Sequence, residues 1–194
     1  MSWWDILKTT EFSYDPKVPK GRANRRLLIE QGIPKIQIGL NRWNEIKNKN
    51  NLTDEQVAQG MANTIQHEYT HLATTGEVYG EIHKLVDEMV KLFSQPNFNQ
   101  TQLEPLIRKF IGVMFMDEWM ARAGMPKQEI ALLTFEKALT YYPKVWSNKI
   151  LKFLEKEGIK NKIDDAPEFV KYVKSITLDE FNKLVNKYKQ KLGI

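Results

Sequence analysis

The succession of helix-forming and helix-breaking residues after Leu52 is the feature that most limits how this chain can fold. Thr53-Asp54-Glu55-Gln56 is a capping box, in which the Thr hydroxyl and the Gln side chain bond free backbone N–H groups at a helix start. Beyond it, apolar residues recur at helical spacing, and Pro or Gly interrupts them at intervals. The pattern predicts helices over 54–73, 77–93, 103–123, 127–141, 144–157, 166–175 and 178–192, with breaks at Pro143, Gly158 and Pro167.

One earlier segment has the period of a β-strand. Within residues 33–40, Ile36, Ile38 and Leu40 alternate with smaller or polar residues, as in a half-buried strand. Pro34 stands at its start and favours an edge strand, because proline cannot donate to a sheet ladder. We therefore expect a mainly α fold (α+β) with a small sheet that includes an edge strand near 33–40, and a helical C-terminal half. Residues 1–26, rich in Pro, Gly and charge, are expected to be loosely structured.

Composition excludes several classes of protein. The chain has no cysteine, so a disulfide scaffold, a thiolate zinc site and a cysteine nucleophile are all excluded. No long uncharged apolar run is present that could span a membrane. Lys and Arg number 29 against 24 Asp and Glu, a mild excess that is spread along the chain. Nucleic acid is therefore an unlikely partner, because dedicated nucleic-acid surfaces usually carry a dense basic cluster.

The sequence His67-Glu68-Tyr69-Thr70-His71 carries the chemistry. Residues four apart on a helix project side by side, so His67 and His71 can both reach one Zn²⁺ at about 2.0–2.1 Å. Glu68 lies about 100° further round, where it can contact a metal-bound water and act as a general base. Only three histidines occur in the chain, and two of them have this spacing, which makes a chance match rare.

A strand near 36–40 followed by a helix with this motif resembles the core of the zincin metallopeptidases. The resemblance covers residues 33 to about 73 and extends more loosely to 124. It implies that the two histidines bind zinc, that Glu68 activates the water, and that the edge strand aligns the substrate antiparallel to itself. It also divides the chain into a zincin-like core over 1–124, with its active-site helix near 54–73, and a helical C-terminal subdomain over 125–194.

A catalytic zinc site needs a third protein ligand. In the metzincin branch this ligand follows the second His by six residues, with a Gly three residues after that His. Here those positions hold Glu77 and Thr74, so that pattern is not met and Glu77 stays a weak candidate. His83 lies roughly 120° from the centre of the apolar stripe of its predicted helix, at about 100° per residue, and should face water.

Glu118 is the stronger candidate. It falls within an apolar stripe that Ile107, Phe110, Ile111, Met114 and Ala121 form at helical spacing. A carboxylate on a buried face is costly unless it is paired or binds a metal. The gluzincin branch takes its third ligand as a Glu from a later helix, and Glu118 resembles that residue. A Glu118–Arg122 ion pair is the alternative interpretation, and Asp117 is a candidate hydrogen-bond partner for a ligating His.

The sequence therefore predicts a gluzincin-like zinc metalloendopeptidase that acts on a protein or peptide substrate. Two alternatives stay open: a non-catalytic or latent zincin-like interaction protein, and a DNA-associated protease. Residues 1–5 do not read as a secretory signal, so a cytoplasmic location is the default expectation. Association with a virus particle or release by lysis also stays open. Specificity, the oxyanion-stabilising residue and oligomeric state do not follow from the sequence.

Overall fold

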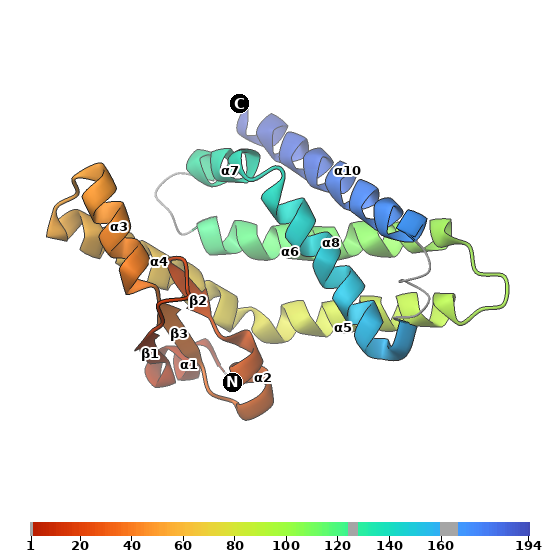
Figure 1. Cartoon of the computed structure of the whole chain (residues 1–194), viewed down its shortest axis with the longest axis horizontal. Coiled ribbons are helices and arrows are strands. Elements are labelled where there is room, and N and C mark those ends of the chain that lie inside the picture. The colour runs from red at the N-terminus through yellow and green to blue at the C-terminus, as the bar shows by residue number, and fades with distance from the viewer. Residues whose placement is uncertain (1, 124–127, 160–166) are drawn as a thin grey trace. The chain divides into compact units, whose positions relative to one another are not determined.

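The computed structural model describes residues 2–123, 128–159 and 167–194, and the protein is mainly helical with a small mixed sheet. The chain divides into two compact units. The first comprises Met1–Glu77 with Met120–Pro126, and the second comprises Val78–Trp119 with Lys127–Ile194. Figure 1 labels the helices and strands along the chain. Among the described residues, no helix combines the length and the apolar character needed to cross a membrane.

The first unit contains a three-stranded sheet and the helices connected to it. Its elements are α1 (Trp3–Thr9), β1 (Glu11–Tyr14), β2 (Gly21–Ala23), α2 (Arg25–Gln31), β3 (Lys35–Ile38), α3 (Leu40–Asn50) and α4 (Asp54–Ala73). Residues 1–26 were expected to be loosely structured, and this is wrong for the described part, which forms α1, β1 and β2. Ile6 of α1 is buried, whereas Trp3 and Trp4 are exposed.

The predicted strand near 33–40 is present as β3, but it is the central strand and not an edge. The order of strands is β1-β3-β2, with β1 parallel to β3 and β2 antiparallel to it. Pro34 is compatible with this position because it precedes the paired residues and uses its carbonyl, which accepts a hydrogen bond from the Glu11 N–H. The predicted alternation is confirmed for Ile36 and Ile38, which are buried with the half-buried Gln37 between them, but it is wrong for Leu40, which is exposed and begins α3.

Helix α4 has the predicted bounds. The Thr53 hydroxyl accepts from the Gln56 N–H at 3.2 Å, and the Gln56 side chain accepts from the Thr53 N–H at 2.9 Å, so the capping box is complete. Against the sheet, α4 contributes Leu72 to a small apolar cluster with Ile6, Ile36, Ile38 and Trp43. Helices α2 and α3 were not predicted; α2 begins at an Asn24 cap, whose side chain accepts from the Leu27 N–H.

The second unit is built from helices alone in its described residues. Its elements are α5 (Thr75–Phe93), η1 (Gln100–Leu103), α6 (Glu104–Ala123), α7 (Gln128–Lys137), α8 (Tyr141–Leu154), η2 (Glu155–Ile159) and α10 (Pro167–Leu192). The first residues of α5 and the last residues of α6 belong to the first unit. Trp119 and Trp146 are buried, and the core between the helices is rich in aromatic rings.

Three predicted features of these helices differ from the structure. The helices predicted over 166–175 and 178–192 are one helix over Pro167–Leu192, in which the buried Thr177 hydroxyl bonds the Val173 carbonyl without interrupting the backbone. Residue 166 lies outside the described residues. Pro143 lies in the first turn of α8, where no helical N–H is required, so it does not break the helix. The predicted helix over 127–141 ends earlier, at Lys137, and residue 127 lies outside the described residues. Gly158 does mark a break, with φ of 86°.

Candidate metal centre

His67 and His71 lie side by side on α4, as their spacing predicts. Their Nε2 atoms are 3.0 Å apart and their ring centroids 4.6 Å apart. His71 is buried and His67 is half-buried, so both rings are partly withdrawn from water. Two imidazole nitrogens at this separation either share a proton or bind a common cation, and tetrahedral zinc would place them roughly 3.3 Å apart.

Glu68 is held by the neighbouring strand β2. The backbone N–H of Ala23 donates to Glu68 Oε2 at 2.7 Å. This contact is available because β2 approaches α4 closely: a Cβ on Gly21 would lie 2.5 Å from Thr64 Cγ2 and 3.4 Å from Glu68 Cγ. Glycine at position 21 therefore allows the strand to reach the motif. A main-chain donor is fixed by the fold, so it holds one carboxylate oxygen of Glu68 in a set orientation.

The C-terminal end of α4 is also fixed by side chains. Arg25 Nε donates to the His71 carbonyl at 2.8 Å, and another guanidinium nitrogen of Arg25 donates to Thr74 Oγ1 at 3.0 Å. The Thr75 hydroxyl donates to the same His71 carbonyl at 2.7 Å. A cation at a helix C-terminus is favoured by the helix dipole. These contacts therefore hold the backbone of His71 in place.

The roles of Ala23 and Arg25 were not predicted from the sequence. The Ala23–Glu68 bond joins residues 45 apart in the chain, and the Arg25–His71 bond joins residues 46 apart. Neither residue has a distinctive spacing from the motif. Gly21 is the one local signal, since a glycine inside a strand often marks a close approach of the backbone to another group.

Glu118 lies on α6, within the apolar stripe predicted for it. Glu118 itself is half-buried. The apolar residues of the stripe are all buried: Ile107, Phe110, Ile111, Met114 and Ala121. The Tyr142 hydroxyl at the start of α8 donates to Glu118 Oε2 at 3.4 Å. Asp117, the candidate hydrogen-bond partner of a ligating histidine, is buried with 1% of its surface exposed.

The three ligands predicted from the sequence come from both units: His67 and His71 belong to the first, and Glu118 belongs to the second. The donor types, two imidazole nitrogens and a carboxylate oxygen, are those found in catalytic zinc sites with three protein ligands.

The two weaker candidates for the third ligand are both exposed. His83 is exposed, as predicted, and its ring lies against the rings of Tyr79 and Phe153. Glu77 is exposed near the start of α5.

Comparisons of the chain with protein-family models, with curated proteins and with solved structures yielded no match. The geometry of the site therefore carries the functional argument by itself.

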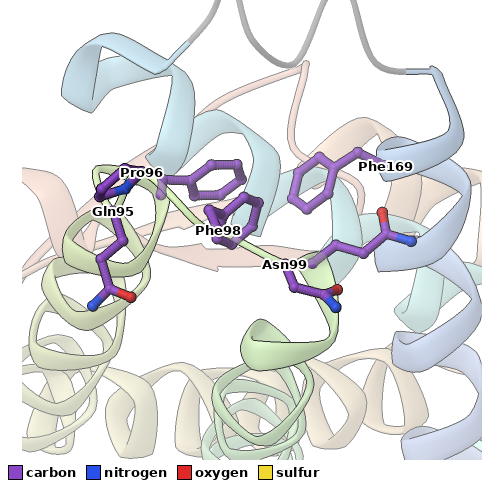
Figure 2. Close-up of a pocket in the computed structure, with 7 residues that line it drawn as sticks. Gln95, Pro96, Phe98, Asn99 and Phe169 are labelled. Carbon is purple, nitrogen blue, oxygen red and sulfur yellow. The ribbon is translucent and has the colours of Figure 1, made fainter.

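A cavity of about 650 Å³ lies elsewhere, in the second unit (Figure 2). Aromatic rings and side-chain amides line it: Phe93, Phe98 and Phe169 with Gln95, Asn99, Gln100 and Pro96. The Phe93 ring stacks on Phe98 at 4.4 Å and meets Phe169 edge-on at 5.1 Å, so these rings already contact one another. Among the described residues that line this cavity, none has an ionisable side chain that could act as an acid, a base or a charged metal ligand.

Proposed function

We propose that this chain is a zinc-dependent metalloendopeptidase that hydrolyses peptide bonds. The observation that carries the proposal is the pair of imidazole nitrogens 3.0 Å apart on α4, next to a glutamate whose carboxylate is oriented by a backbone N–H. A surface histidine pair of no function would not require a neighbouring carboxylate held in this way. The motif and this local geometry together favour hydrolysis over a purely structural metal site.

The ligand set of the proposed zinc ion is His67, His71 and Glu118. Two observations support Glu118 as the third ligand: it is a half-buried carboxylate within an apolar stripe, and the gluzincin resemblance takes this ligand from a later helix. Three protein ligands leave one position open, which distinguishes a catalytic zinc site from a closed structural one.

Each protein group would have a separate task in the reaction. When bound, zinc would supply Lewis-acid polarisation of the scissile carbonyl and lower the pKa of a coordinated water. Glu68 would accept the proton from the attacking water and transfer it to the leaving amine. The Ala23 N–H would keep the Glu68 carboxylate aimed during this transfer, and Arg25 would hold the helix end that carries His71.

The strand beside the motif is β2, and we assign to it the substrate-aligning role that the zincin resemblance gives to an edge strand. The Lys20 carbonyl accepts from the Gly39 N–H, and the Asn24 N–H donates to the Lys35 carbonyl, so both main-chain groups face the β3 side. Main-chain groups of successive residues face opposite edges of a strand, so those of Gly21 and Ala23 face the edge away from β3. The Ala23 N–H is taken by Glu68. An extended substrate would therefore bond to the Gly21 N–H and to the carbonyls of Gly21 and Ala23.

The test of this function is Glu68→Gln, assayed on a library of peptides from a digested proteome, with new termini detected by mass spectrometry. We expect the wild type to produce new termini when loaded with zinc, and the variant to lose cleavage by about 10²–10⁴-fold, the usual contribution of a general base. Zinc content should be unchanged, because Glu68 is not a proposed ligand.

Glu77→Gln is the matched control, since it removes a nearby but exposed carboxylate from the next helix. It should leave both cleavage and zinc content at the wild-type level. Cleavage by Glu68→Gln at the wild-type rate, or an absence of new termini with zinc-loaded wild type, would contradict the proposed function.

A further inference from the structure

We propose that Tyr142 is a positioning residue for Glu118: its hydroxyl hydrogen bond fixes the carboxylate in the orientation that binds zinc. The inference rests on the proposed function, because it concerns the third ligand of the same site. It assigns a role to a side chain that the motif does not contain and that lies on another helix, α8.

The Tyr142 ring is anchored by the core of the second unit. It contacts Trp146 at 5.1 Å, Phe135 at 5.4 Å and Phe181 at 6.2 Å between ring centroids. Trp146, Phe135 and Phe181 are themselves buried. These ring contacts restrict the side chain of Tyr142, so its hydroxyl oxygen is held near one position as a donor.

The hydroxyl donates to Glu118 Oε2, with 3.4 Å between the oxygens. A carboxylate that binds a metal through one oxygen needs a donor for the other when it is withdrawn from water, and Glu118 is half-buried. Partners of this kind orient a ligand before the ion arrives, and their loss typically weakens metal binding by about 10–100-fold.

The chain provides an internal control for this bond. The Tyr172 hydroxyl donates to Glu104 Oε2 at 3.2 Å, and Glu104 lies on the same helix α6 as Glu118. Glu104 is bound by Arg108 and is not a proposed zinc ligand. Tyr172→Phe and Tyr142→Phe therefore remove the same kind of hydrogen bond, and only Tyr142→Phe touches a proposed ligand.

The experiment is a competition titration of zinc against a chromophoric chelator, on full-length wild type, Tyr142→Phe and Tyr172→Phe. Phenylalanine keeps the anchored ring, so we expect both variants to fold and to melt at similar temperatures without metal. Zinc should bind about 10-fold more weakly to Tyr142→Phe and with unchanged affinity to Tyr172→Phe. In a Glu118→Ala background, Tyr142→Phe should cause no further loss.

Equal zinc affinity of Tyr142→Phe and wild type would overturn the positioning role while leaving the metal site intact. Equal weakening by both Tyr→Phe variants would also overturn it, because the effect would then be a general one on the second unit. A further loss caused by Tyr142→Phe in the Glu118→Ala background would show that Tyr142 acts other than through Glu118. A wild-type protein that binds no zinc would overturn both this inference and the proposed function.

Discussion

The two units of this protein differ in how they use their helices. In the second unit, helices α5, α6, α7, α8 and α10 contribute apolar and aromatic side chains to one large core, with Phe110, Phe115, Phe135 and Phe181 all fully buried. In the first unit the buried cluster is small, and α4 contributes only Leu72 to its fully buried members. The same helix carries polar and ionisable groups along most of its remaining length.

This difference shows where a chain of this size can place a reactive site. Imidazole and carboxylate groups need partial burial together with hydrogen-bond partners, and purely apolar side chains do not supply such partners. Helix α4 obtains partners from a sheet edge and from Arg25, through the Ala23–Glu68 and Arg25–His71 bonds. The second unit supplies stability by aromatic packing and contributes Glu118 with its Tyr142 donor, whereas the first supplies the histidine pair, Glu68 and their main-chain and Arg25 partners.

The largest change in stability that we expect comes from removing a buried aromatic ring from the second unit. Phe181 is fully buried and contacts the rings of Phe115, Phe135 and Trp146. We expect Phe181→Ala to lower the free energy of unfolding by about 3–5 kcal/mol, because it removes a large buried side chain and leaves a cavity. Urea denaturation followed by circular dichroism measures this loss.

The matched substitution in the first unit is Ile36→Ala, at a position that is also fully buried. We expect Ile36→Ala to lower the free energy of unfolding by about 2–3 kcal/mol, near the lower end for truncation of a buried Ile to Ala. The loss is smaller because the apolar cluster around Ile36 has few buried members. A loss at Ile36 that exceeds the loss at Phe181 would contradict the view that the second unit supplies most of the stability.

A smaller effect concerns the ion pairs of the two units. Arg108 bonds Glu104, Asp179 and Glu180 on α6 and α10, and its hydrogen bond holds the pKa of the Glu104 carboxyl below its usual 4.5. A depressed pKa means that the folded protein binds fewer protons than the unfolded chain, so this stabilisation is complete above about pH 4.5 and is lost as the pH falls through the lowered pKa. We expect Arg108→Met to lower the melting temperature by a few degrees at pH 7, and by less at pH 3.

Arg42→Met is the control from the first unit. Arg42 pairs with Glu45 on α3, and both side chains are largely exposed, at 54% and 64%. An exposed pair of this kind contributes about 0–1 kcal/mol to stability. The melting temperature of Arg42→Met should therefore be nearly that of the wild type at both pH values. If the effect of Arg108→Met does not shrink at low pH, the carboxylates are not the source of its stabilisation.

The sequence was most informative where local physics decides the structure. The capping box of α4, its end near Ala73 and the adjacency of His67 and His71 follow from helix geometry, and the structure confirms them. The apolar stripe around Glu118 is also confirmed, since its members are buried. The identity of the third ligand stays a prediction, because it depends on residues that lie far apart in the chain.

The sequence was least informative about the sheet and the contacts across it. Strands β1 and β2 were not predicted, and their pairing on both sides of β3 makes that strand central. The Ala23–Glu68 bond uses a main-chain N–H, which every residue other than proline possesses, so nothing in the side chains announces it. Tyr142 likewise gave no local signal, because its partner is on a different helix.

The central claim is that His67, His71 and Glu118 hold one zinc ion, and its most direct measurement is the zinc content of purified protein. We predict about one zinc per chain in the wild type by elemental analysis after loading and desalting, and a sharp fall in both His71→Ala and Glu118→Ala. His83→Ala is the control, since it removes the remaining histidine of the chain, which is exposed. Full zinc content in Glu118→Ala would contradict the assigned third ligand, and a wild type without zinc would contradict the account as a whole.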